Sequence, residues 1–194
     1  MSQPLRLLLV EDTESDALLL ERHLRRAGYE VDACRVESAA EMRDALEQGS
    51  WDLILSDFNL PQFDMDGALD LVQSKGLDIP FIIVSGTISE DIAVRMMRRG
   101  VQDFVLKDNL TRLVPAVQRE LGEAIMRRER RRADAALKQS QAELELAAQV
   151  FESSSEAIVI VDALRKIVTV NKMFSQMSGY APEEVLARPL SEFA

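Results

Sequence analysis

The sequence predicts an α/β fold: a doubly wound parallel sheet of five strands, followed by a long helix and the beginning of a smaller α+β domain. Three observations support this prediction. Short apolar runs alternate with amphipathic, helix-length segments at a spacing of about 25 residues. Residues 111–148 are then nearly free of glycine and proline. Two apolar runs of strand length follow after residue 156.

The five expected strands are short and rich in leucine, isoleucine and valine. They cover Leu5–Val10, Tyr29–Arg35, Trp51–Ser56, Phe81–Val84 and Val101–Leu106. Helical periodicity predicts helices over Ser15–Arg26, Ser38–Gln48, Gly67–Ser74 and Glu90–Arg99. The run Thr13-Glu-Ser-Asp16 is a weak capping box for the first of them. The first and fourth strands are too apolar to have a face in water, so helices should cover both faces of the sheet.

Composition limits the possible functions. The chain has 194 residues, of which 47% are hydrophobic, and a net charge of −10, which argues against a nucleic-acid partner. The single Cys34 excludes an internal disulfide, and with the single His23 it cannot form a Cys/His zinc site. The sequence contains no cationic leader and no apolar run of about 18 residues. We therefore expect a cytoplasmic protein with no membrane segment in these residues.

Polar residues follow four of the five expected strands. In doubly wound sheets, ligands bind outside the carboxyl ends of the strands, at the topological switch point. The polar residues at the strand ends converge on one cleft if the strand order is 2-1-3-4-5. The residues at these ends are Glu11, Asp12, Asp57, Ser85 and Lys107. Clustered carboxylates raise one another's pKa unless a cation lies among them, and oxygen ligands suit Mg²⁺ before Ca²⁺. The sequence therefore predicts a cation-binding cleft with a hydroxyl and an ammonium beside it.

These residues carry a family resemblance. The segment from about Leu5 to Leu121 resembles the receiver domain of two-component response regulators, a family with a flavodoxin-like and CheY-like fold. The matching residues are the pair Glu11-Asp12, Asp57 with Asn59, Ser85, Phe104 and Lys107. The resemblance implies that Asp57 is the phosphoacceptor and that its phosphoryl group comes from a sensor histidine kinase or a phosphotransfer protein.

The resemblance also implies a metal site. Asp12, Asp57 and the backbone carbonyl of Asn59 would bind Mg²⁺ directly, and Glu11 would act mainly through water. A carboxylate is a competent nucleophile once metal and cationic groups stabilise charge on the phosphoryl oxygens. The chemistry therefore needs no histidine in the site.

Two further residues would contact the phosphoryl group, and a third would respond to it. By the resemblance, Ser85 donates its hydroxyl to one phosphoryl oxygen and Lys107 pairs with another. Switching in the family couples this hydroxyl to an aromatic residue on the fifth strand. Phe104 occupies that position, and it can respond only by packing because it lacks a hydroxyl.

The sequence departs from the family pattern at three places. Gly86 follows Ser85 where many receivers have alanine, which would leave the phosphoryl group more open to water. Asp108 replaces the usual proline after the lysine. The turn from Pro61 to Gly67 is longer than the common one by about two residues, so the loop entering the third helix should be unusual.

Other functions are compatible with parts of this pattern. A receiver that no longer takes phosphate could serve as a dimerisation or interaction platform. A phosphatase of the haloacid-dehalogenase type would need Asp-x-Asp after its first strand, whereas the motif here is Asp57-Phe-Asn59 after the third. A flavodoxin-like FMN binder would carry a hydroxyl-rich and glycine-rich loop after its first strand, where Glu11 and Asp12 would repel the phosphate.

Residues 111–150 predict one continuous helix, with Pro115 tolerated in its first turn. Apolar positions keep a coiled-coil spacing in two registers. The first contains Val114, Val117, Leu121 and Ala124, and the second contains Ala133, Leu137, Ser140, Leu144, Ala147 and Phe151. The two registers do not join across the basic run 127–132, and such a phase break changes the local winding of a coiled coil. We expect a homodimer through this helix; the alternative is a solvated helix without a partner.

The last segment changes to strands. Residues 157–162 and 166–171 predict a hairpin, and a Gly-Tyr-x-Pro-Glu-Glu turn follows at residues 179–184. This segment resembles the opening of a PAS sensory domain. The predicted organisation is a receiver domain over residues 1–121, an overlapping helical linker over 111–150 and a partial PAS domain over 151–194. By resemblance, a further output domain would turn over cyclic-di-GMP or be a histidine kinase, and a hybrid-kinase input is the alternative.

Overall fold

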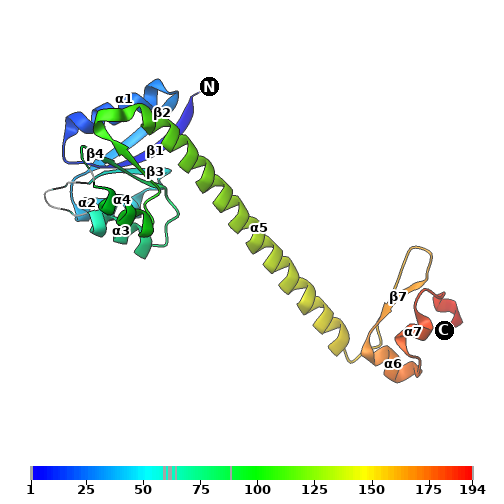
Figure 1. Ribbon diagram of the computed structural model, residues 1–194. Helices are drawn as coiled ribbons and strands as arrows, with labels where there is room; N and C mark the ends of the chain where they lie inside the picture. The colour runs from blue at the N-terminus through cyan, green and yellow to red at the C-terminus, as the bar shows by residue number, and fades with distance from the viewer. Residues whose placement is uncertain (1, 59, 61–62, 64, 88, 194) are drawn as a thin grey trace. The chain divides into compact units, whose positions relative to one another are not determined.

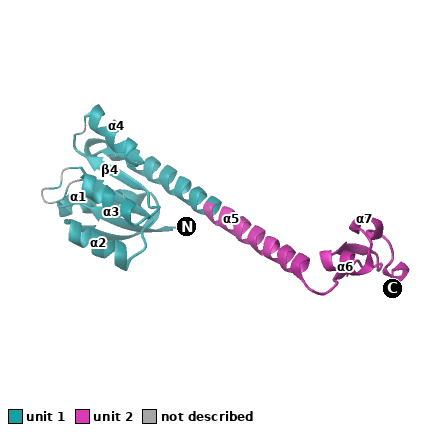
Figure 2. Cartoon of the chain, turned by 90° about the horizontal axis from the view of Figure 1, so that it is seen from below, with its two compact units in different colours: residues 1–130 teal, residues 131–194 magenta. Residues whose placement is uncertain are grey.

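The computed structural model describes residues 2–58, 60, 63, 65–87 and 89–193 (Figure 1). Its chain forms two compact units, Met1–Arg130 and Arg131–Ala194 (Figure 2). The strands of the first unit are β1 (Gln3–Val10), β2 (Tyr29–Val36), β3 (Leu53–Asp57), β4 (Phe81–Ser85) and β5 (Asp103–Leu106). Its helices are α1 (Glu14–Arg26), α2 (Ala39–Gln48), α3 (Met65–Ser74), α4 (Glu90–Arg98), the 3₁₀ helix η1 (Lys107–Arg112) and the first part of α5 (Leu113–Ser153).

The five strands pair in parallel in the order β2-β1-β3-β4-β5, which confirms the predicted fold class. In the register, Asp57 is opposite Val84 and Ser85 is opposite Leu106. Since all strands run the same way, their carboxyl ends share one edge of the sheet. The residues that follow these ends are therefore brought together, although they lie far apart in the sequence.

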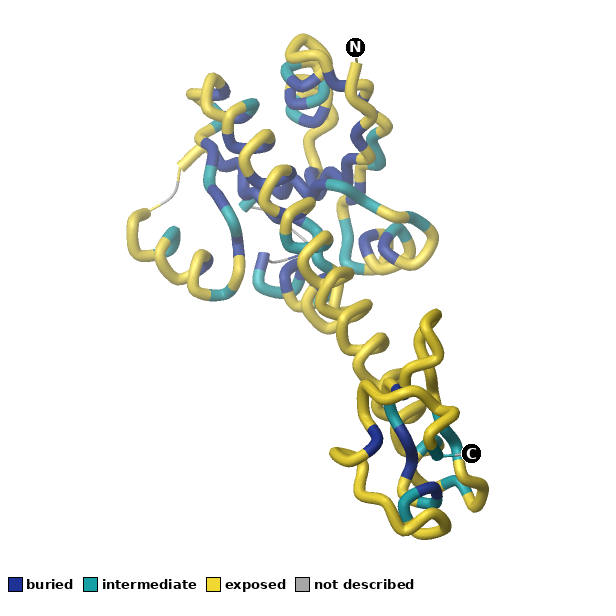
Figure 3. Tube along the Cα trace, turned by 90° about the vertical axis from the view of Figure 1, so that its right-hand side faces the viewer, coloured by how far each residue is buried: buried dark blue, intermediate teal, exposed yellow. Residues whose placement is uncertain are grey.

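Helices cover both faces of the sheet, and each face has its own apolar core. On one face, leucines of β1 and β3 pack against α1 and the beginning of α5. On the other face, Leu8, Ile54 and Ile83 belong to a cluster that includes residues of α2, α3 and α4. The central strands are buried along their length (Figure 3). This two-sided burial explains why the first and fourth strands contain no alternating polar residues.

The strands and helices from β1 to β5 each differ by one or two residues, at one end or both, from the bounds that the sequence predicts. The expected fifth strand begins at Asp103 instead of Val101. Gln102 still bonds to β4, because its backbone N–H donates to the Phe81 carbonyl at 3.0 Å and its side chain accepts the Phe81 N–H at 2.6 Å. The capping box at Thr13 is wrong: its side chain accepts no capping hydrogen bond within the described first turn of α1. Its hydroxyl instead donates to Asp12 Oδ1 at 3.3 Å.

The long helix is continuous, as predicted, and extends further at its end. It begins at Leu113, after the turn η1, and ends at Ser153. Its first turns are buried in the first unit through Leu113, Val117 and Leu121. Arg127 and Arg128 of the basic run then contact Asp78 before β4, through Oδ1 at 3.1 Å and the backbone carbonyl at 2.9 Å respectively. From residue 129 to residue 150 every position is exposed.

The second unit contains the predicted hairpin. Its elements are β6 (Val159–Val161), β7 (Ile167–Val170), α6 (Lys172–Ser178), α7 (Pro182–Val185) and the 3₁₀ helix η2 (Leu190–Glu192). The strands β6 and β7 pair antiparallel. A small core of Ile167, Val170, Phe174 and Val185 lies beneath them. Among the described residues, no helix is both long and apolar enough to cross a membrane.

Asn171 connects several parts of the second unit. Its Oδ1 accepts the N–H groups of Ile158 and Phe174, and so caps α6. Its Nδ2 donates to the carbonyls of Phe151, in the last turn of α5, and of Glu156. The side chain is almost fully buried. These four hydrogen bonds tie the end of α5 to the hairpin and to α6.

Candidate functional site

Four strands deliver the polar residues of the site to one edge of the sheet. Glu11 and Asp12 follow β1, Asp57 is the last residue of β3, and Ser85 is the last residue of β4. Lys107 directly follows β5 and begins η1. The apolar strands behind these residues are buried, so the polar side chains begin where the core ends. The structure thus brings together the strand-end residues that the sequence singles out.

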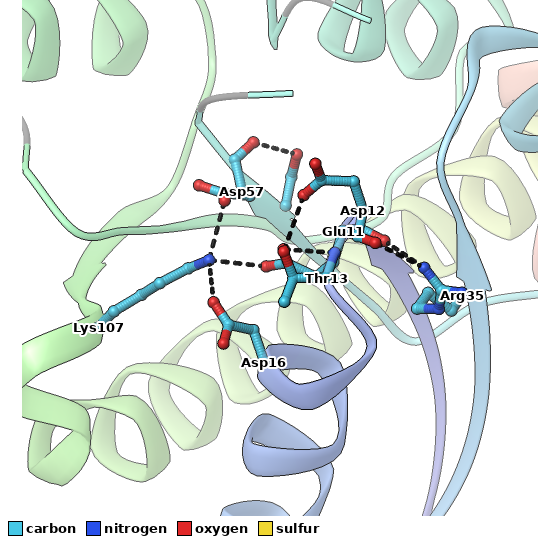
Figure 4. Close-up of polar contacts among 8 residues, drawn as sticks. Glu11, Asp12, Thr13, Asp16, Arg35, Asp57 and Lys107 are labelled. Carbon is cyan, nitrogen blue, oxygen red and sulfur yellow. Dashed lines mark hydrogen bonds and ion pairs between the residues drawn. The ribbon is translucent and has the colours of Figure 1, made fainter. Parts of the chain in front are cut away.

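Lys107 is the centre of this group (Figure 4). Its ammonium donates to Glu11 Oε2 at 2.9 Å and to Asp57 Oδ2 at 2.8 Å. A third carboxylate, Asp16 in the first turn of α1, accepts at 2.6 Å. An ammonium has three donors, and each has a charged acceptor here. Charge-assisted hydrogen bonds of this kind are stronger than neutral ones, so they hold the lysine over the end of β3.

Three acidic side chains lie close enough to share one cation. Ligand atoms of Glu11, Asp12 and Asp57 all lie within 4.8 Å of one another. Glu11 and Asp57 are buried, whereas Asp12 is exposed, so the group opens to solvent on one side. Carboxylate oxygens at this spacing suit a hard divalent ion such as Mg²⁺. The donor chemistry of these residues therefore fits the metal expected from the sequence.

The pKa values of Glu11 and Lys107 are both raised, for different reasons. Burial raises the pKa of the Glu11 carboxyl, and hydrogen bonds from Lys107 and from the Thr13 N–H only partly offset this effect. For Lys107, burial alone would lower the pKa. The hydrogen bonds to Asp16, Asp57 and Glu11 outweigh burial and hold the pKa of the ammonium above its ordinary value. Lys107 is therefore cationic at neutral pH.

Ser85 and Phe104 lie on the β4 and β5 side of the site. The Ser85 side chain is buried, and its hydroxyl donates to the backbone carbonyl of Thr87 at 2.9 Å. It would have to rotate to donate to a group on Asp57. Phe104 pairs with Ile83 in the sheet and packs, half-buried, against the core that contains α4. A methyl group built on Gly86 would meet nothing within 4 Å, so this position is open.

Two contacts escaped the sequence analysis. Asp16 is one of the three partners of Lys107, and the only sequence signal is its place four residues after Asp12. Arg35 on β2 donates to the backbone carbonyls of Glu11 and Asp12 at 3.1 and 3.2 Å, so it fixes the backbone that carries the acidic pair. The predicted role of the Asn59 carbonyl, like the turn at Pro61, falls outside the described residues.

The fold and this site define a class of protein. The chain matches the family model of the response regulator receiver domain over residues 7–118. It also matches a PAS domain model over residues 145–194. The chain belongs to the response regulator receiver domain family, and a connecting helix leads from its receiver domain to the segment that matches a PAS domain.

Several known proteins are similar to this receiver. Regulatory protein LuxO of Vibrio vulnificus (strain YJ016) is 35% identical over 99 residues, which are 51% of this chain and 21% of that protein. The transcriptional regulatory protein PrrA of Mycobacterium tuberculosis is 35% identical over 101 residues, 52% of this chain and 42% of that protein. The chain therefore spans less than half the length of either relative.

Solved structures agree with this assignment. The signal receiver domain of a LuxO repressor protein from Vibrio parahaemolyticus is 30% identical, with a TM-score of 0.58, and the match covers 64% of this chain and 95% of that one. The receiver domain of a signal transduction histidine kinase from Syntrophus aciditrophicus is 27% identical, with a TM-score of 0.52, over 61% and 91% of the two chains. Receivers of this kind thus occur in both regulators and kinases.

Proposed function

We propose that this chain is a phosphorylation-controlled input module in which Asp57 accepts a phosphoryl group in the presence of Mg²⁺. The observation that carries the proposal is the contact of Lys107 with Asp57 beside the acidic group of Glu11, Asp12 and Asp57. A buried carboxylate with a cation on one side and metal-type ligands on the other is suited to nucleophilic attack on phosphorus. Receiver domains are in general signalling domains rather than enzymes with a substrate of their own.

The residues divide the work as follows. An oxygen of Asp57 attacks the phosphorus of a phosphohistidine on the kinase or phosphotransfer partner; the new O–P bond forms as the N–P bond breaks, and the imidazole leaves. Lys107 supplies one donor to a developing phosphoryl oxygen. Ser85 rotates from the Thr87 carbonyl to supply another. Bound Mg²⁺ would neutralise charge on the phosphoryl oxygens, held by Asp12, Asp57 and the Asn59 carbonyl directly and by Glu11 through water.

The change would then be relayed along α5. We propose the division into a receiver at residues 1–121, a helical linker at 111–150 and a partial PAS domain at 151–194. The linker pairs with its copy in a homodimer through Leu137, Leu144 and the other positions of its second register. Large apolar residues on this stretch of α5 are more than half exposed, which supports a partner helix. Ser85 and Phe104 form the switch, and Phe104 acts by repacking against the α4 side.

We propose a cytoplasmic regulator whose further domain turns over cyclic-di-GMP. A hybrid histidine kinase is the second candidate, which the similarity to the Syntrophus aciditrophicus kinase receiver favours. In both cases the partner of the receiver is a phosphohistidine protein, and the partner of α5 is a second copy of the chain.

Incubation with acetyl phosphate and Mg²⁺, followed by intact mass measurement, tests the proposal. The wild type should gain one acid-stable, base-labile phosphoryl group, and Asp57→Asn should gain none. Asp44→Asn, which changes an exposed aspartate on α2, is the matched control and should behave like the wild type. Equal phosphorylation of Asp57→Asn would show that the acceptor is wrong. No phosphorylation of the wild type would favour the interaction platform.

A further inference from the structure

Asp16 differs from the other two carboxylates that contact Lys107. Glu11 and Asp57 belong to the acidic group that could share a cation, and the described members of that group are Glu11, Asp12 and Asp57. Asp16 comes from a different element, α1, and its contact with the ammonium of Lys107 is the shortest of the three, at 2.6 Å. Among the described residues, Asp16 is therefore a partner of Lys107 that does not belong to the acidic group.

The difference between Asp16 and the other two carboxylates becomes important when the metal binds and Asp57 is phosphorylated. In the proposed function, the charge of Glu11 and Asp57 is shared with the metal, and one Asp57 oxygen becomes bonded to phosphorus. Both carboxylates then attract Lys107 less, because a carboxylate oxygen that is bonded to phosphorus or bound to a metal carries less negative charge. Asp16 keeps its full charge and its place through these steps. It is the one carboxylate among the three that can hold the ammonium both before and after phosphorylation.

The surroundings of Asp16 support a fixed geometry. Its backbone N–H donates to the Thr13 carbonyl at 3.1 Å, so its position is set by the first turn of α1. A carboxylate there is also favoured by the helix dipole. A small cavity beside the pair is walled by the apolar side chains of Leu19, Leu20 and Leu110. The Asp16 side chain is 35% exposed and that of Lys107 is 22% exposed, so the pair is partly shielded from water.

We propose that Asp16 is a positioning residue, which holds the ammonium of Lys107 over the phosphoacceptor throughout phosphorylation and hydrolysis. This inference rests on the proposed function of Asp57 and Lys107 and adds a residue to it. Asp16 itself need not touch the phosphoryl group, because it acts through the lysine. Its removal should therefore slow phosphoryl transfer without removing the acceptor or the acidic group.

The test compares initial rates of phosphorylation by acetyl phosphate at saturating Mg²⁺. Asp16→Asn should slow the reaction by about fivefold, the size expected for a partly exposed ion pair of roughly 1 kcal/mol. Asp16→Glu restores the charge and should recover part of the rate. The control is Glu14→Gln, which removes another exposed acid from the same first turn and should leave the rate near that of the wild type.

A double-mutant cycle separates positioning from general electrostatics. In a Lys107→Ala background, Asp16→Asn should cause no further loss, because the group it positions is absent. The affinity for beryllofluoride, measured on the same variants, gives an equilibrium readout that needs no turnover and should show the same pattern. Thermal unfolding of each variant establishes that it is folded.

Two results would overturn the inference and leave the proposed function standing. One is a wild-type rate in Asp16→Asn; the other is the same fivefold loss in the Lys107→Ala background, which would assign the effect to net charge. If the wild type itself takes no phosphoryl group on Asp57, both the proposed function and the role of Asp16 fail. The two failures are therefore distinguishable in one set of measurements.

Discussion

The ammonium of Lys107 donates to Asp57 Oδ2 across 2.8 Å, and this contact joins the carboxyl ends of two strands of the sheet. The lysine is thus poised beside the carboxylate before any phosphoryl group arrives. Replacing it by methionine, which keeps the aliphatic stem, should lower the rate of phosphorylation by acetyl phosphate by about a hundredfold, the usual effect of losing one preorganised donor. Lys75→Met removes a lysine paired with Glu47 at the surface and should change nothing. Equal losses in both variants would contradict a specific role for Lys107.

The charge of Glu11 should cost stability when no metal is bound. Burial raises its pKa in the folded chain above the ordinary value of 4.5. Between 4.5 and the folded pKa, the native state binds the proton more tightly, so stability falls as pH rises through this window. We expect Glu11→Gln to be more stable than the wild type at neutral pH in EDTA, and the difference to shrink below pH 4.5. Urea unfolding at both pH values measures this.

The opposite change in the stability of Glu11→Gln would contradict this expectation. A lower stability of Glu11→Gln at neutral pH would mean that the ion pair with Lys107 outweighs the cost of burial.

Added Mg²⁺ should raise the unfolding midpoint of the wild type, because a ligand that binds only the folded state stabilises it. Asp57→Asn should lose most of this gain.

Asn171 should control how the second unit is attached to α5. Asn171→Ala removes four hydrogen bonds and should lower the local stability by about 2 kcal/mol. Asn171→Asp keeps an acceptor for the Phe174 N–H but has no donor for the Phe151 carbonyl. Hydrogen exchange should therefore accelerate at residues 150–153 and 172–175 in Asn171→Ala, but chiefly at residues 150–153 in Asn171→Asp. Identical profiles would show that the donor side of Asn171 has no separate role.

The dimer proposal predicts a difference between two leucines of α5. Leu144 belongs to the second apolar register, whereas Leu146 does not, and their exposed fractions are similar, 68% and 62%. Leu144→Asn should raise the Kd of the dimer by about a hundredfold, because it removes from each copy a leucine that the proposed dimer buries. Leu146→Asn should leave it unchanged. Sedimentation at several concentrations measures both; a monomeric wild type at micromolar concentration would contradict the proposal.

Much of the fold could be predicted because its signals are local. Each strand is an apolar run and each helix has a 3.6-residue period, so a parallel sheet covered by helices follows from general rules. The strand order 2-1-3-4-5 is what the family resemblance implies. The convergence of Glu11, Asp57, Ser85 and Lys107 needs no further information. The end of α5 was harder to predict from the sequence. The helix continues to Ser153, past the predicted residue 150, and there the Phe151 carbonyl accepts a hydrogen bond from Asn171.

The contacts that the sequence did not indicate are those between distant residues of ordinary type. Asp16 reads as a helix N-terminal acid, and its contact with Lys107 joins residues 91 positions apart. Arg35 reads as a surface residue of an edge strand, although it binds the backbone after β1. At Thr13, the hydroxyl donates to Asp12 instead of capping the helix. Each case depends on packing between elements, which local periodicity does not encode.

We propose that Asp57 is the phosphoacceptor of a metal-dependent site. Beryllofluoride mimics a phosphoryl group on a carboxylate, and fluorine NMR reports its binding directly. We predict bound signals that saturate at one adduct per chain with Mg²⁺, disappear in EDTA and are missing in Asp57→Asn. Bound signals of equal intensity in Asp57→Asn, or in the wild type without a divalent ion, would contradict the account.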